Sequence, residues 1–188
     1  AVRFFAIGDV PYSESEYELL AALLERELRR SPAFLVHVGD IKSGSAPCAD
    51  QAFARITDLF QSLPVPVLYT PGDNEWTDCH RRRAGGFDPR ERLTRLRQIF
   101  YDEGPVLRLD QLGAEANDPS YPENYYLLVN GVLFAAVHLV GSHNNLTPGK
   151  EASLTERLER SEANRAHLER IAAVAKAEDA TSLVLLFH

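Results

Sequence analysis

Three aspartates follow a glycine at the end of an apolar run, and this repeated position is the first sign of chemistry. The pairs are Gly8-Asp9, Gly39-Asp40 and Gly72-Asp73, and each apolar run is typical of a buried strand. If the strands are parallel, their carboxyl ends share one sheet edge, where α/β proteins bind ligands. Carboxylates that meet there repel one another, and bound cations relieve the repulsion. The spacing therefore predicts a metal site with Asp9, Asp40 and Asp73 as ligands.

His188 is a fourth candidate ligand, because it follows the apolar run at residues 182–187. Oxygen ligands suit Mg²⁺ or Mn²⁺, and an added imidazole extends the choice to Fe and Zn. Gly-Asp is also a common turn pair and Asp often caps a helix, so one pair alone predicts a cap rather than a ligand. Four such side chains at four strand ends favour a metal site.

The elements that position these residues alternate between strand and helix. Strands are expected at residues 3–7, 34–38 and 65–69. Helices are expected from Ser13, which has capping-box spacing with Glu16, and over residues 50–63. An apolar stripe at helical spacing comprises Leu19, Leu20, Leu23, Leu24 and Leu28. This alternation predicts right-handed crossovers and a parallel sheet.

The second half of the chain predicts a different pairing. Asn130-Gly131 between apolar runs at 125–129 and 132–140 indicates a β-hairpin. Helices are expected over 89–101 and 154–176, a loop over 141–153, and a last strand over 182–187. We expect one α/β domain over residues 1–188, with a further C-terminal segment missing, because a domain rarely stops at the tip of a central strand.

Composition excludes some classes of function. The formal charge is -7, and the one dense basic run, at residues 80–83, is short, so no nucleic-acid partner is indicated. No apolar run approaches the roughly 20 residues of a membrane span. An acidic surface with local arginines suits a small anionic ligand. The oligomeric state has no sequence signature.

The two cysteines bear on the compartment. Cys48 follows the second Gly-Asp motif and Cys79 the third, so both are expected on loops of one sheet edge. They form either one disulfide or two separate thiols. A disulfide and an N-terminal Ala in a chain without methionine are consistent with a secreted or periplasmic protein. A cytoplasmic chain trimmed at its start is the alternative.

Four motifs, GDVPY, VGDIKSG, PGDNEW and LLFH, carry a resemblance to a known family. In order and spacing they resemble the Asp-x-His, Gly-Asp, Gly-Asn-His-Asp/Glu and strand-ending His motifs of the calcineurin-like metallophosphoesterases. The resemblance spans nearly the whole chain. It implies a four-layer αββα sandwich, a two-metal centre and hydrolysis of a phosphomonoester or phosphodiester.

The resemblance also implies a role for each predicted ligand. Asp9 matches the first-motif ligand, and Asp40 matches the carboxylate that bridges both metals. Asp73 falls where the family has an Asn ligand, and His188 matches the strand-ending His. Two divalent ions (Mn, Fe, Zn or Mg) would hold a bridging hydroxide that attacks a small phosphorylated substrate.

Two departures from the family pattern affect catalysis. Pro11 replaces the His of Asp-x-His, and Tyr12 is either a tyrosinate ligand in its place or a plain aromatic wall. Asn74 replaces the His that acts on the leaving group, and an amide cannot act as an acid near pH 7. His80 is the candidate substitute, although an exposed loop histidine is the plainer interpretation. A one-residue shift would instead make Asn74 a metal ligand. Glu75 is expected to support the ligands rather than to bind the metal itself.

Further basic residues could bind the substrate. Arg81, Arg82 and Arg83 could clamp a phosphate or form a solvated charge run. His138 and His143 could line the cleft, although His138 also fits a core imidazole. Because two family histidines are replaced, the alternative function is a catalytically impaired metal- or phosphate-binding protein of the same fold.

Overall fold

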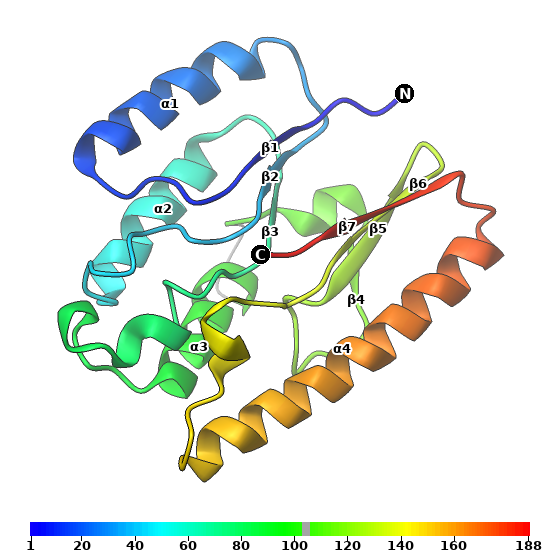
Figure 1. Cartoon of the computed structure of the whole chain (residues 1–188). Coiled ribbons are helices and arrows are strands. Elements are labelled where there is room, and N and C mark those ends of the chain that lie inside the picture. Colours follow the sequence, from blue (N-terminus) through cyan, green and yellow to red (C-terminus); the bar gives the residue numbers. More distant parts are fainter. Residues whose placement is uncertain (103–105) are drawn as a thin grey trace.

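The computed structural model describes residues 1–102 and 106–188, which form two β-sheets with helices on the outer faces (Figure 1). The first sheet is parallel, in the order β1 (Phe5–Ile7), β2 (Leu35–His37) and β3 (Val67–Tyr69). The second has the order β4 (Glu115–Ala116), β5 (Tyr125–Val129), β6 (Val132–Ala136) and β7 (Ser182–Leu186). The α-helices are α1 (Glu14–Leu28), α2 (Asp50–Ser62), α3 (Pro89–Arg97) and α4 (Glu151–Ala177).

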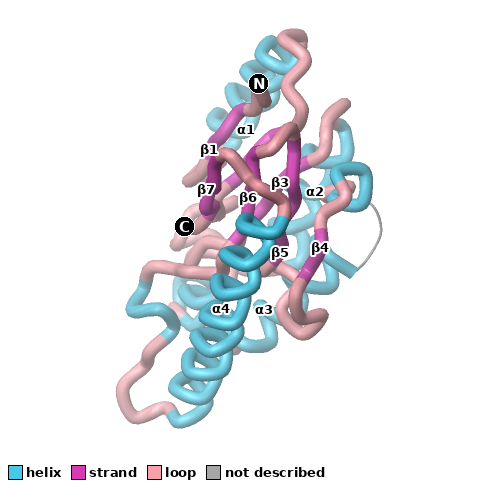
Figure 2. The backbone as a smooth tube through the Cα atoms, turned by 90° about the vertical axis from the view of Figure 1, so that its right-hand side faces the viewer, coloured by secondary structure: helices cyan, strands magenta, loops and turns pink. Residues whose placement is uncertain are grey.

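Alternate side chains of the strands build three cores and hence four layers. Phe34 and Val36 point toward the second sheet, while Leu35 points toward α1 and α2. The ring of Phe34 meets that of Phe134 from β6 at 5.0 Å between centroids. A third core lies between the second sheet and α4, which runs in front of that sheet in Figure 2. The order helices, sheet, sheet, helix is the predicted αββα sandwich.

Helix α1 begins at its predicted cap but buries a narrower face than expected. The Ser13 hydroxyl accepts a hydrogen bond from the Glu16 amide at 3.2 Å. Leu20, Leu24 and Leu28 are buried in one i, i+4 row. Leu19 is 69% exposed, so its place in the buried stripe was predicted wrongly. Leu23 is also exposed, whereas Tyr17 and Ala21 are partly buried against the same core as the row of leucines.

The hairpin turn matches its prediction, whereas the strand that follows is shorter. Asn130 and Gly131 have φ of 51° and 80°, as a two-residue type I′ turn requires. β6 ends at Ala136, because its parallel partner β7 ends opposite, at Leu186. Helix α4 begins at Glu151, so the predicted loop over 141–153 is helical at its end. Helix α3 stops at Arg97 and continues as a π-helix to Asp102.

A disulfide between Cys48 and Cys79 joins the loop after β2 to the loop after β3. Of the two alternatives for the cysteines, the structure has the bonded one. Both residues are fully buried. The disulfide fixes the two loops that carry the second and third Gly-Asp motifs. Among the described helices, none combines the length and apolar character needed to cross a bilayer.

Candidate metal centre

The loops after the three strands of the first sheet bring the Gly-Asp motifs together. Asp9 and Asp40 have φ of 58° and 57°, in the left-handed region that few side chains adopt. A Cβ on Gly39 would lie 2.2 Å from the amide nitrogen of Gly72. The second and third loops therefore touch backbone to backbone, and only glycines permit this approach. The contact places Asp40 and Asp73 in one cluster.

His188 completes this cluster from the end of β7. Its Nε2 lies 3.5 Å from Asp40 Oδ1 and 3.9 Å from Asp73 Oδ1. Its Nδ1 lies 2.9 Å from the Val38 carbonyl, which only accepts, so Nδ1 carries the proton. In the neutral form of the ring, Nε2 therefore carries the lone pair, and Nε2 is the atom that faces the two carboxylates. An imidazole whose other nitrogen donates to a carbonyl is the usual arrangement of a metal-binding histidine.

The size and donor set of the cluster fit a divalent cation. Asp40, Asp73 and His188 each offer one ligand atom, and these atoms all lie within 4.8 Å of one another. Ligand atoms that surround one ion at about 2 Å lie roughly 3 to 4 Å apart. Two carboxylates with one imidazole suit Mn, Fe or Zn, and Mg is compatible with the oxygens. Burial alone would lower the pKa of His188, but Asp40 raises it, because Nε2 faces negative charge.

Tyr12 connects Asp9 to the cluster. Its hydroxyl lies 3.1 Å from Asp9 Oδ1 and 3.0 Å from Asp40 Oδ2. A hydroxyl has one proton, so it can donate to only one of these carboxylates at a time. Burial and the charge of Asp40 raise the pKa of Tyr12 far above its usual value. Contact with both acids places Tyr12 in the centre, which a plain aromatic wall would not require.

Asn74 holds Asp40 from the other side. Its amide nitrogen donates to Asp40 Oδ1 at 3.0 Å, and its Nδ2 donates to Oδ2 at 2.5 Å. Its carbonyl accepts from the buried ammonium of Lys42 at 2.7 Å and lies 3.5 Å from Cys48 Sγ. Asn74 thus offsets charge on Asp40, and Lys42 with the disulfide fixes its position. With its amide group rotated by 180°, Oδ1 would face the cluster as a ligand.

Glu75 supports the cluster from within the core. Its Oε1 accepts from the amides of Asp40 and Gly72 at 3.0 and 2.7 Å and from the Tyr69 hydroxyl at 2.9 Å. Burial and the nearby charge of Asp40 raise the pKa of Glu75 to about 7. Burial also raises the pKa of Asp40. Acids arranged so that they resist ionisation mark a functional site, because a bound cation reverses the effect.

The loop after β6 forms the opposite rim of the centre. A Cβ on Gly141 would lie 2.5 Å from Asp73 Oδ2, so a side chain at this position would displace the carboxylate. The following turn η5 (Ser142–Asn145) has positive φ at all four residues. The fully buried Arg160 donates to the Asn144 side chain at 2.7 Å and holds the turn in place. Such backbone strain persists only where surrounding contacts impose it.

The predicted substrate-binding residues differ in their exposure to solvent. Arg81 is half exposed at the rim, with Nη1 2.6 Å from Asp78 Oδ2 and Nη2 3.4 Å from Ser142 Oγ. Arg82, Arg83 and His143 are exposed on the same two loops. His138 is fully buried, with its Nδ1 2.8 Å from Glu123 and its ring 5.2 Å from that of Trp76.

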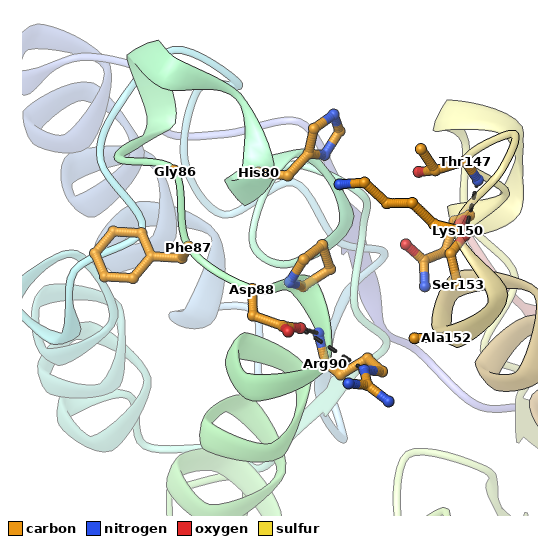
Figure 3. A pocket seen from close by; sticks show the side chains of 11 residues that line it. His80, Gly86, Phe87, Asp88, Arg90, Thr147, Lys150, Ala152 and Ser153 are labelled. Carbon is orange, nitrogen blue, oxygen red and sulfur yellow. Dashed lines mark hydrogen bonds and ion pairs between the residues drawn. The ribbon is translucent and has the colours of Figure 1, made fainter.

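His80 lies beside the cluster rather than in it. It ends the turn η1 (Thr77–His80), is exposed, and donates from Nδ1 to the Thr77 carbonyl at 2.6 Å. It lines a cavity of about 310 Å³ formed with the start of α3 and the segment from Asn145 to Ser153 (Figure 3).

Lys42 and Glu123 are buried charges that the sequence pattern did not single out. Lys42 stands two residues after Asp40, and a lysine so close to a predicted strand end could have indicated a buried partner. Glu123 has no such local signal, because its partners Arg97 and His138 are distant in sequence.

Comparison with known proteins places this geometry in a family. The model of the calcineurin-like phosphoesterases matches residues 2–188, and the chain belongs to this family. A solved structure similar to it is that of a dimetal phosphatase from Danio rerio, with 15% identity and a TM-score of 0.49. The alignment covers 84% of this chain and 50% of that protein, so the chain spans about half its length. No curated protein matches the chain significantly. Family membership supports metal-dependent phosphoester chemistry in general terms.

Proposed function

We propose that the protein is a metal-dependent phosphoesterase that hydrolyses a small phosphomonoester or phosphodiester. The observation that carries the proposal is the position of His188 Nε2, which lies 3.5 Å from Asp40 Oδ1 and 3.9 Å from Asp73 Oδ1. Divalent ions bound there would offset the charge of phosphoryl oxygens and lower the pKa of water to give a nucleophile near neutral pH. Membership of the calcineurin-like phosphoesterase family supports the same class of reaction.

The four proposed ligands would divide around Asp40. Asp73 and His188 cluster with Asp40, whereas Asp9 is linked to it through the Tyr12 hydroxyl, which contacts Asp40 Oδ2. Asp40 is therefore the carboxylate that can bridge two ions, whose identity would be Mn, Fe, Zn or Mg. Glu75 and Asn74 orient it through its own amide and its carboxylate oxygens.

Residues at the rim of the candidate metal centre would contact the substrate. Arg81, fixed by Asp78, would donate paired hydrogen bonds to phosphoryl oxygens, and Arg82 and His143 would meet the rest of the substrate. The buried His138 would not touch the substrate; its ring packs against Trp76 and would hold the loop that carries Asp73 and Arg81.

Protonation of the leaving group needs an acid other than Asn74. His80 is the candidate, because its Nδ1 proton is bound to the Thr77 carbonyl and its Nε2 can carry a second proton. The buried disulfide supports an extracellular or periplasmic location.

A second candidate function is a metal- or phosphate-binding protein with impaired catalysis. Asn74 favours this function, because an amide that donates to Asp40 stands where the family pattern has a histidine. Pro11 stands in place of a second histidine of that pattern. Metal binding without turnover would distinguish this function from the phosphoesterase.

The Asp40→Asn variant tests the proposal. Bound metal per chain and hydrolysis of a panel of phosphomonoesters and diesters are measured on the full-length protein. We expect the variant to lose both, while Asp58→Asn, an exposed position on α2, keeps both. Full metal content in Asp40→Asn would contradict the bridging role. A metal-loaded wild type that hydrolyses nothing in the panel would favour the second function.

A further inference from the structure

The cavity beside the metal centre is rich in basic side chains. His80, Arg90 and Lys150 line it together with polar groups of Asn145, Thr147 and Ser153 (Figure 3). Its volume of about 310 Å³ is at the lower end of the range for small-molecule sites. In a chain with a formal charge of -7, this local excess of positive charge is an exception.

The one acid of the cavity lining is already engaged. Asp88 accepts from the Arg90 amide at 2.8 Å as the cap of α3, and it lies 3.8 Å from Arg90 Nε. Among residues 1–102 and 106–188, no carboxylate pairs with the Lys150 ammonium. Figure 3 shows this side chain extending toward His80. Lys150 is the N-cap residue of α4 and makes no side-chain cap, so the first amides of that helix add positive potential.

The same two loops run past the cavity and the candidate metal centre. His80 is adjacent in sequence to Arg81, which reaches Ser142 at the rim of the centre. On the other wall, Asn145 follows four residues after Gly141, whose Cβ position is 2.5 Å from Asp73 Oδ2. Four residues span at most about 14 Å. A small molecule can therefore reach from one site to the other.

We propose that this cavity binds a second phosphate group of the substrate while the scissile phosphate lies at the metal centre. The inference rests on the proposed phosphoesterase function and narrows its substrate class to small compounds that carry two phosphates. Three basic groups fit a dianion, and Arg90 can donate two parallel hydrogen bonds to it. Thr147 supplies a hydroxyl to a remaining oxygen, while the Ser153 hydroxyl donates to the Asn145 carbonyl and holds the cavity wall.

The first test measures binding of inorganic phosphate to the protein in EDTA, by calorimetry. Without metal the carboxylates of the centre repel phosphate, so binding reports on the cavity. We expect Arg90→Gln/Lys150→Gln to weaken binding about tenfold or more. The control Arg157→Gln/Lys176→Gln removes the same number of positive charges from α4, at positions that do not line the cavity, and should bind as the wild type does. Equal binding by both double variants would overturn the proposal.

The second test compares hydrolysis of 1,6-hexanediol monophosphate and bisphosphate by the metal-loaded protein. The wild type should show a higher kcat/KM for the bisphosphate, and Arg90→Gln/Lys150→Gln should lower that preference about tenfold. The variant should leave the monophosphate unchanged. If both compounds are hydrolysed with an unchanged preference, the cavity proposal fails and the phosphoesterase stands. If neither is hydrolysed although phosphate binds in EDTA, the phosphoesterase fails and the anion site stands alone.

Discussion

Replacing Glu123 by Gln should destabilise the protein at neutral pH and flatten its response to acid. Glu123 is fully buried, and its carboxylate accepts from Arg97 at 2.6 and 2.9 Å and from His138 at 2.8 Å. Burial alone would raise its pKa, but the hydrogen bonds from His138 and Arg97 lower it from 4.5 to about 2. The variant leaves Arg97 without a countercharge and weakens the acceptor for His138, whose own pKa burial lowers.

The size of the effect follows from that pKa. A difference of about 2.5 between the folded and free values corresponds to about 3 kcal/mol. The unfolded chain takes up a proton near pH 4.5 and the folded protein only near 2. This stability is therefore fully present above pH 4.5 and is lost as the pH falls toward 2. This value agrees with the general cost of removing one partner from a buried ion pair, which is about 3–5 kcal/mol.

Urea unfolding followed by fluorescence measures the effect, because Trp76 is the only tryptophan and is fully buried. At pH 7, Glu123→Gln should be about 3 kcal/mol less stable than the wild type. The difference should shrink by about 2 kcal/mol between pH 4.5 and 3. Glu162→Gln, in an exposed pair with Arg165, is the matched control and should change nothing measurable. A Glu123→Gln variant within about 1 kcal/mol of the wild type, with a parallel pH curve, would refute the reasoning.

Two further perturbations have expected outcomes. The double variant Cys48→Ala/Cys79→Ala should unfold with about 3–4 kcal/mol less stability, because the disulfide closes a separation of 31 residues; an unchanged urea midpoint would contradict this. Burial lowers the pKa of His37 from 6.5 to about 4, so the unfolded chain binds a proton at higher pH than the folded protein. Stability should therefore fall by about 3 kcal/mol between pH 6.5 and 4, and His37→Asn should show a smaller slope over that interval. Identical slopes would count against the assigned environment of His37.

Much of the fold follows from local patterns in the sequence. Ser13 caps α1 as its spacing with Glu16 predicted, and Asn130-Gly131 forms the predicted hairpin turn. These signals lie within a few residues, where propensity and turn geometry act directly. Leu19 shows the limit of such patterns, because its exposure depends on how α1 lies on the sheet.

Some residues of the candidate site could be predicted from local patterns, whereas others could not. The strand-end positions of Asp40 and Asp73 are enough to predict that these two residues lie close together, because parallel strands end at one sheet edge. His188 follows β7 of the second sheet, so its approach to them depends on how the two sheets pack. The roles of Tyr12 and Glu123 depend on contacts between distant segments, which no local pattern reveals. The bonding of Cys48 to Cys79 likewise needed the fold, since an even number of cysteines leaves pairing open.

The central claim is that Asp9, Asp40, Asp73 and His188 form a divalent metal centre. Anomalous diffraction from crystals grown with Mn²⁺ tests it most directly. We expect one anomalous peak among Asp40, Asp73 and His188 Nε2, and a second beside Asp9 that shares Asp40. Crystals that contain Mn²⁺ but show no peak at these side chains would contradict the claim.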